Sequence, residues 1–214
     1  TADTVVNLAG ERISARWTAA RKAAILESRV QTTRNVVDAL PAGKPGLALI
    51  NASGVGFYGA HGDEPLTEDA PPGDDFLAGV CVAWEGEAVR AASKARGVLL
   101  RTGLVLDRSD GALPPLALPF RLFAGGPTGS GQQWWSWIHL ADWVSLTVSA
   151  IERSDLAGPI NVTAPNPVKN REFARTLGKV LHRPALLPTP ALPLRLAMGE
   201  MADALILTGQ RVLP

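Results

Sequence analysis

The sequence contains few of the residues that hold metal ions or build disulfide frameworks. Its 214 residues include one cysteine, Cys81, and three histidines. A single cysteine excludes a disulfide framework and a cysteine-ligated zinc site, and the histidines lack the spacing typical of metal ligands. We therefore expect no metal. Because a lone free thiol suits a reducing compartment, we also expect a cytoplasmic protein.

Excess charge and long apolar runs are lacking too. The net charge is +1, and no long basic run occurs, which argues against nucleic acid as a partner. No apolar run approaches the ~20 residues that a membrane-spanning helix needs, so we expect no membrane partner. The apolar content of 46% is ordinary for a globular protein. The length suffices for one large domain or one and a half small ones.

The stretch from residue 47 to residue 59 is the centre around which the chain is organised. Its apolar run, 47–50, is short enough for a strand buried on both faces, and small or polar residues follow at 51–54. In an open α/β sheet, ligands bind at the carboxyl ends of the strands. This stretch places Ser53 there, with Tyr58 one loop further on. A buried strand followed by an ordinary glycine loop explains the same residues equally well.

Strands and helices alternate along the chain. Apolar runs predict strands at 4–8, 47–50, 98–106 and 158–164, and the third bends or ends at Gly103. Helical periodicity and capping residues predict helices at 18–40, about 75–96, 116–123 and 142–152, and another that Asn170 caps. Alternation at 132–140 places Trp135, Trp137 and His139 on one face. Such an order favours an α/β fold with right-handed parallel crossovers.

Eight stretches of the chain, in order, resemble an extended or atypical short-chain dehydrogenase/reductase. The resemblance is to the nucleoside-diphosphate-sugar epimerase-like branch with its own small C-terminal domain. The stretches are VVNLAGERI, RWTAARKAAILESRVQTT, NASGVGFYG, EDAPPGDDFL, LLRTGLVL, GGPTGSGQQWWSWIHLAD, NVTAPNPVKNREFA and GEMADALILTGQRVLP. The resemblance implies a Rossmann-like parallel sheet with helices on both faces and a small, mostly helical C-terminal portion. It also implies NADP or NAD as cofactor, with NADP favoured.

The same resemblance divides the chain into two parts. Residues 1–165 correspond to an NAD(P)-binding domain without its first βα units, and 111–138 to a substrate-side insertion. Residues 166–214 correspond to the C-terminal domain. The family's glycine-rich pyrophosphate fingerprint belongs to those first units, so we expect roughly 50–60 further residues before Thr1, at ~30 per βαβ unit. We expect residues 1–214 alone to bind a dinucleotide weakly, because that turn supplies the pyrophosphate's N–H donors.

The usual Tyr-x-x-x-Lys acid pair of the superfamily is absent. Tyr58 is the single tyrosine, and Gly62 stands four residues after it. Aligned by eye, the two positions of the pair fall near Phe76 or Leu77 and near Val80 or Cys81. The serine that normally partners this tyrosine falls at Ser53 or Gly54.

Candidate site residues follow from these placements. Those expected to bind the cofactor lie at predicted strand ends, where small residues let a ligand approach the backbone, although they also serve plain turns; they are Asn7, Ala9, Gly10, Ser53, Arg101, Thr102 and Gly103. Those expected to act in catalysis are Tyr58, Ser53 and His139. A tyrosine packed on the acidic loop and a core histidine beside Asp142 are the structural alternatives. Those expected to contact substrate are Trp17, Arg121, Gln133 and Trp135.

Together these features favour an NAD(P)-dependent oxidoreductase or sugar-nucleotide-epimerase-like enzyme without the usual Tyr-x-x-x-Lys pair. Its partner is a small-molecule substrate, with nucleotide-sugars among the candidates. The missing pair also supports an alternative of another class, a non-catalytic NAD(P)H-binding sensor or partner-binding protein.

Overall fold

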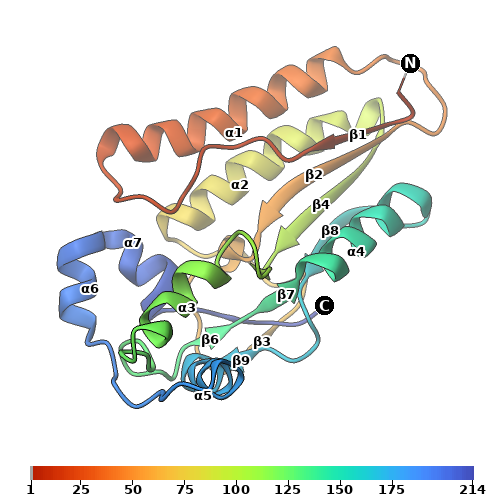
Figure 1. Cartoon of the computed structure of the whole chain (residues 1–214). Helices are drawn as coiled ribbons and strands as arrows, with labels where there is room; N and C mark the ends of the chain where they lie inside the picture. The colour runs from red at the N-terminus through yellow and green to blue at the C-terminus, as the bar shows by residue number, and fades with distance from the viewer. Residues whose placement is uncertain (1) are drawn as a thin grey trace.

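A four-stranded parallel sheet forms the centre of the protein (Figure 1). The computed structural model describes residues 2–214. The strand order is β1 (Thr4–Asn7), β2 (Ala48–Gly54), β4 (Arg96–Thr102) and β8 (Gly158–Val162). All neighbours are parallel, as crossover connections through helices require. The predicted α/β class is confirmed.

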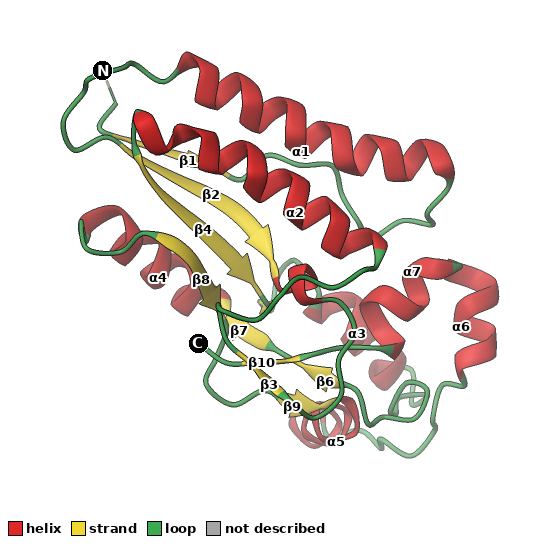
Figure 2. Cartoon of the chain, turned by 180° about the vertical axis from the view of Figure 1, so that it is seen from behind, coloured by secondary structure: helices red, strands yellow, loops and turns green. Residues whose placement is uncertain are grey.

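Helices cover both faces of this sheet. The helices α1 (Ala19–Ala39) and α2 (Phe76–Val89) lie together on one face, and α4 (Leu140–Glu152) lies on the other (Figures 1 and 2). Alternate residues of β2 point to opposite faces, so Leu49 packs with Val37 of α1 while Ile50 packs with Ile138. Burial on both faces explains why the strand is a continuous apolar run.

The strand expected at 98–106 is broken into two pieces. It divides at Gly103 into β4 and β5 (Leu104–Leu106), as the sequence predicts. A Cβ atom at Gly103 would lie 2.6 Å from the carbonyl oxygen of Ser136. Glycine therefore permits the crossing of the two chain segments at the carboxyl end of the sheet.

A second lobe lies below the carboxyl end of the sheet (Figure 2). It consists mainly of residues 103–139 and 163–214, together with the short strand at 65–66. Four short strands bring distant segments together there, as β5 pairs with β7 (Trp137–His139) and β6 (Trp134–Trp135) pairs with β9 (Val168–Lys169). At the chain's end β10 (Arg211–Val212) pairs with β3 (Pro65–Leu66). The helices of this lobe are α3 (Leu113–Arg121), α5 (Asn170–Leu181), α6 (Ala191–Met198), α7 (Glu200–Ala202) and the π-helical turn η3 (Asp203–Leu207).

Three expectations about local structure differ from what is observed. The helix α2 ends at Val89, and a short 3-10 turn, η2 (Arg90–Ser93), replaces its last predicted turn. Asn170 is the first residue of α5 rather than its cap, because its side chain accepts from the backbone N–H of Thr128. The alternation at 132–140 is interrupted between β6 and β7, and Ile138 is buried while His139 is exposed.

Two kinds of feature are missing from the described residues. Within residues 2–214, no helix combines the length and the apolar character that crossing a membrane demands. The same part of the chain has no cluster of three or more His, Cys, Asp or Glu side chains placed to hold a metal ion.

Candidate functional site

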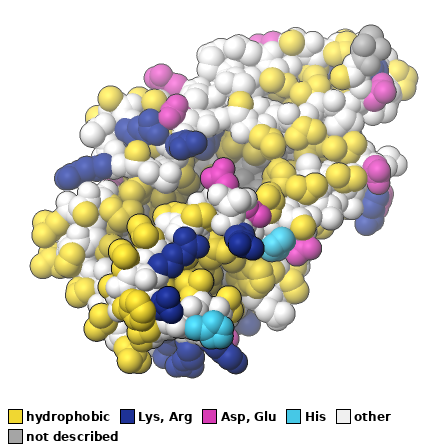
Figure 3. Space-filling model, in the orientation of Figure 1, with side chains coloured by type: hydrophobic (Ala, Val, Ile, Leu, Met, Phe, Trp, Pro, Cys, Tyr) yellow, Lys and Arg dark blue, Asp and Glu magenta, His cyan; other side chains and the backbone are white. Residues whose placement is uncertain are grey.

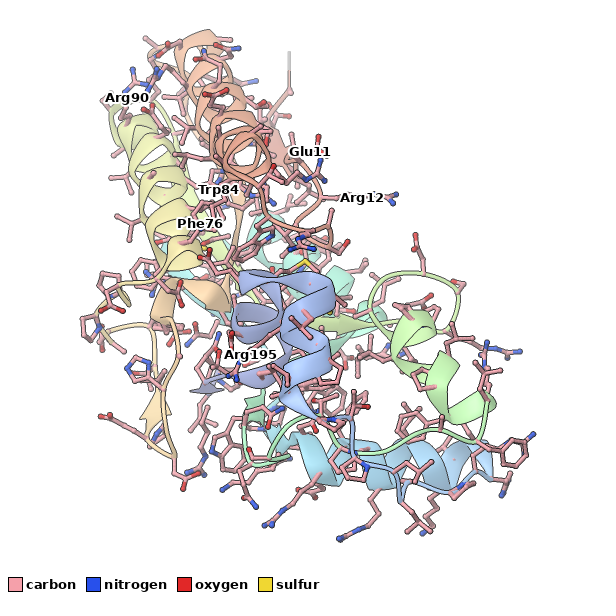
Figure 4. The ribbon with its side chains drawn as sticks, turned by 90° about the vertical axis from the view of Figure 1, so that its left-hand side faces the viewer. Glu11, Arg12, Phe76, Trp84, Arg90 and Arg195 are labelled. Carbon is pink, nitrogen blue, oxygen red and sulfur yellow. The ribbon has the colours of Figure 1, made fainter. Side chains whose placement is uncertain are left out.

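A pocket of about 540 Å³ lies where β1, β2 and β4 end. Its wall joins the strand ends to one side of α2 and to the second lobe, and Figure 3 shows apolar side chains bordering this recess. Figure 4 shows α2 running from Phe76, next to the second lobe, past Trp84 to Arg90 at the far end. The wall residues that matter most are Leu8, Arg29, Ser53, Cys81, Trp84, Thr102, Gly103, Trp135, Trp143 and Leu205.

Behind the wall lies a buried ion pair that includes Ser53 in its hydrogen bonds. The hydroxyl of Ser53 donates to Oε1 of Glu85 at 2.6 Å. The guanidinium of Arg101 binds the same carboxylate through both oxygens, at 3.0 and 2.9 Å. Glu85 and Arg101 are 6% and 5% exposed. Since the proton of Ser53 is directed to Glu85, the oxygen of Ser53 is left as a hydrogen-bond acceptor.

Tyr58 belongs to this buried network and has no solvent exposure. Its hydroxyl donates to Oδ1 of Asn161 at 2.6 Å and accepts from Nη1 of Arg101 at 3.0 Å. Burial raises the pKa of Tyr58, and the hydrogen bond from Arg101 opposes that rise. The phenol thus stays protonated at neutral pH and orients Arg101 from behind the wall.

Cys81 and Glu85 are four residues apart on α2 and face the end of β2 together. The thiol of Cys81 contacts the carbonyl oxygen of Gly54 at 3.7 Å, while Glu85 binds Ser53. Burial raises the pKa of the Cys81 thiol to about 11, so it is protonated at neutral pH. Positions 81 and 85 are thus an i, i+4 pair of this helix whose side chains contact the last two residues of β2.

Some of the predicted cofactor residues lie in the pocket wall, and the others lie outside it. Ser53, Thr102 and Gly103 lie in the pocket wall. Asn7 is buried, and its amide donates to Thr33 and to Asn51 at 2.9 and 2.7 Å, tying β1 to α1 and β2. Asn7 therefore has a structural role, because it links the carboxyl end of β1 to β2 and α1.

Two other predicted cofactor positions follow β1 in an exposed loop. Ala9 and Gly10 are exposed, and Gly10 lies so close to Arg29 that a Cβ atom there would be 2.9 Å from the guanidinium carbon. The remaining cofactor candidate, Arg101, lies in the buried network. Glycine at position 10 thus makes room for Arg29.

The predicted substrate residues and His139 are more scattered. Trp135 lies in the pocket wall. Trp17 packs edge to face on Phe76 with ring centroids 5.0 Å apart, and Arg121 is exposed at the end of α3. The amide of Gln133 donates to the carbonyl of residue 206 at 2.7 Å. His139 is an exposed N-cap of α4, accepting from the N–H of residue 141 at 3.1 Å, so it is not a core histidine.

Several wall residues were absent from the predicted set. Trp84 and Cys81 fall on an apolar helical stripe that also fits an ordinary core, and Trp143 follows the tryptophan-rich strands. The signal that could have singled out this face is Glu85, a carboxylate that directly follows the apolar run 76–84. A buried charge needs a partner, and the partner here is Arg101 at a strand end.

Glycines 54, 56 and 59 follow β2 with the G-x-G-x-x-G spacing of dinucleotide-binding proteins. That motif binds pyrophosphate when an α-helix begins at the glycines. Here they are followed by η1 (Val55–Tyr58), a four-residue 3-10 helix. Their role is local, since Gly59 has φ of +67° and packs directly on Gly73.

The pocket suits the nicotinamide end of a dinucleotide. Ala52, Gly54 and Gly103 are small residues at strand ends, where backbone can approach a flat ring. The hydroxyls of Ser53 and Thr102 lie among them, and apolar side chains form most of the remaining wall. Flat apolar walls with a few placed polar groups are typical of cofactor sites.

Comparisons with known proteins place the chain in a family. Residues 1–163 match the model of the NAD dependent epimerase/dehydratase family, and 189–214 match a domain of unknown function (DUF1731). The chain is 46% identical over 213 residues to the epimerase family protein SDR39U1 homolog, chloroplastic, of Arabidopsis thaliana. That match covers 98% of the chain and 61% of the relative, so the chain spans about three fifths of its length.

Solved structures agree with this assignment. The crystal structure of human epimerase family protein SDR39U1 with NADPH superposes with a TM-score of 0.92 at 36% identity, covering the whole chain and 74% of the human one. A nucleoside-diphosphate sugar epimerase from Corynebacterium glutamicum superposes with a TM-score of 0.78 at 37% identity, covering the whole chain and 41% of that protein. The chain therefore belongs to the NAD dependent epimerase/dehydratase family and has its Rossmann-like, NAD(P)-binding fold.

Proposed function

We propose that the protein is an NAD(P)-dependent enzyme of oxidoreductase or epimerase type that prefers NADP. The observation that carries the proposal is the pocket at the carboxyl ends of three parallel strands, with Ser53 in its wall. Preference for NADP is supported by the NADPH named with the human relative's structure. When bound, the cofactor supplies hydride transfer.

Leu8, Ser53, Thr102 and Gly103 would hold the nicotinamide end, because they are the wall residues at the strand ends. The division expected from the sequence, with a cofactor domain at 1–165 and a substrate-side domain at 166–214, is part of this proposal. The insertion at 111–138 includes Trp135, which lines the same pocket. A cytoplasmic location is proposed from the single free cysteine.

Ser53 is the residue that we propose touches substrate. Its oxygen can accept a hydrogen bond from a substrate hydroxyl, since its own proton points to Glu85 at 2.6 Å. A proton taken up at Oγ of Ser53 can thus be matched by one passed on to Oε1 of Glu85. Tyr58 acts as a positioning residue, because it holds Arg101 against that carboxylate.

The experiment is a fluorescence titration of the purified full-length protein with NADPH and with NADH. We expect saturable binding of at least one, tighter for NADPH. The absence of a saturable signal with either cofactor would refute the proposal. Ser53→Ala should then lower turnover of an alcohol substrate by a larger factor than it weakens cofactor binding.

A second candidate function is an NAD(P)H sensor or partner-binding protein without turnover. It is favoured by one observation: the side chains of α2 that hydrogen-bond the end of β2 are Cys81 and Glu85, and this helix contains neither a tyrosine nor a lysine. Turnover of any member of a panel of carbonyl compounds, alcohols and nucleotide-sugars would exclude it.

A further inference from the structure

The pocket wall is unusually rich in tryptophan. Four of the chain's six tryptophans line it, namely Trp84, Trp134, Trp135 and Trp143. Leucine, isoleucine and valine side chains from the strand ends, from α2 and from the second lobe supply most of the remaining surface. Flat aromatic faces and aliphatic groups stabilise a bound ligand by burying its apolar surface. They provide no positive charge or hydrogen-bond donor for an anion.

Arg29 is the one charged residue in this wall among the residues that the structure describes. One nitrogen of its guanidinium is already engaged, because Nη1 donates to the carbonyl oxygens of Glu11 and Ile25, at 3.0 Å each. The guanidinium carbon also lies 5.0 Å from the ring centroid of Trp84. A diphosphate buried here would need further cations or a helix N-terminus, since an unpaired charge is costly to desolvate.

Most neutral polar side chains of the wall are also committed to the protein, although the buried Nε1 of Trp135 has no hydrogen-bond partner among the described residues. The hydroxyl of Thr102 donates to the carbonyl of residue 100 at 3.0 Å and accepts from Nε1 of Trp143 at 3.1 Å. Thr208 donates to the carbonyl of residue 203 at 2.8 Å, and the amide of Gln210 donates to that of Val55 at 2.8 Å. A sugar ring with several hydroxyls would find few free partners among these side chains.

We propose that this pocket takes an uncharged, largely apolar substrate carrying one alcohol or carbonyl group, rather than a nucleotide-sugar. The inference rests on the proposed NAD(P)-dependent function and names its substrate class. Ser53 offers one acceptor oxygen to a substrate hydroxyl, which matches a substrate with one polar group. The volume of about 540 Å³ has to hold both the nicotinamide and the substrate, which favours a small molecule of one or two rings.

The second lobe contributes the side chain best suited to a test. Leu205 lies in η3 and lines the pocket. Leu196 lies in the neighbouring helix α6 and is 70% exposed, outside the wall. Leu205→Lys places a cation in the apolar wall, and Leu196→Lys makes the same chemical change on open surface.

The experiment measures binding of two probes to the NADPH-saturated full-length protein by calorimetry. One probe is 2-naphthaldehyde, an uncharged aromatic carbonyl, and the other is UDP-glucose. We expect saturable binding of 2-naphthaldehyde and none of UDP-glucose. Leu205→Lys should weaken naphthaldehyde binding at least ~10-fold, whereas Leu196→Lys should leave it unchanged. Circular dichroism and thermal melting report whether both variants are folded. Leu205→Ala, a milder change, should weaken binding less than the lysine does.

The outcomes separate this inference from the proposed function. Saturable UDP-glucose binding, or no naphthaldehyde binding with NADPH bound, would overturn the substrate class while leaving the cofactor proposal intact. Equal weakening in Leu205→Lys and Leu196→Lys would overturn the assignment of this pocket. Failure of both NADPH and NADH to bind would defeat the proposed function and this inference with it.

Discussion

Replacing Arg101 with methionine would remove one partner of the buried ion pair while keeping a side chain of similar length. Arg101 and Glu85 have side chains only 6% and 8% exposed. The carboxylate would then retain the hydroxyl of Ser53 as its remaining side-chain donor. Leaving a buried charge without its partner lowers the free energy of unfolding by ~3–5 kcal/mol.

That loss should be large enough to measure without ambiguity. For a chain of this size, each kcal/mol shifts the melting temperature by ~2–4 °C, so Arg101→Met should melt ~6–20 °C below the wild type. Adding Glu85→Gln removes the stranded charge, so the double variant should be more stable than the sum of the two single losses implies. Calorimetry and equilibrium urea unfolding measure both quantities.

The matched control is Arg34→Met. Arg34 also binds one glutamate, Glu87, through two nitrogens at 3.2 and 2.6 Å, but its side chain is 44% exposed. Solvent and salt screen such a pair, so only a small loss is expected. If Arg101→Met were no more destabilising than Arg34→Met, or if the Arg101 and Glu85 changes were additive, the buried network would not have the structural weight assigned to it.

Three further predictions follow from the same geometry. Tyr58→Phe removes a hydroxyl with two buried partners, so the free energy of unfolding should fall by ~1–3 kcal/mol and turnover should drop while NADPH affinity is unchanged; unchanged unfolding would contradict the network. Cys81, with a pKa raised to about 11, should resist iodoacetamide at pH 8 in the folded protein and react once the protein is unfolded, so rapid labelling of the folded protein would contradict its burial. The part of the free energy of unfolding that is linked to its protonation should decline as the pH rises from about 9 through 11. Gly103→Ala forces a Cβ atom against the carbonyl of residue 136 and should destabilise by ~1–3 kcal/mol, whereas Gly62→Ala meets open space and should be neutral in the same unfolding assay.

Elements with strong local signals were predictable from sequence. Helix α1 runs from Ala19 to Ala39 as expected, because Thr18 accepts from the N–H of Arg21 and the apolar spacing is helical. The break at Gly103 was also predicted, since glycine in a strand marks a bend or a close approach. In both cases the deciding interactions are close in sequence.

The site was predictable only in part, because it depends on contacts between distant segments. Ser53 was expected at a strand end and lies in the pocket wall. Nothing local indicates that Glu85, 32 residues later, accepts from it, since this depends on how α2 crosses β2. Tyr58 illustrates the converse, because a single tyrosine one loop from the serine is typical of a proton donor, yet folding commits its hydroxyl to Arg101 and Asn161.

Energy transfer from tryptophan to bound NADPH tests most directly whether the pocket at the strand ends holds the nicotinamide. With four tryptophans in the wall, excitation of tryptophan should produce saturable, sensitised emission from the reduced nicotinamide as NADPH is added to the full-length protein. Trp143→Phe should weaken that emission, because it removes one of the four tryptophans of the wall. Saturable NADPH binding without sensitised emission would contradict the account, because the nicotinamide would then lie elsewhere.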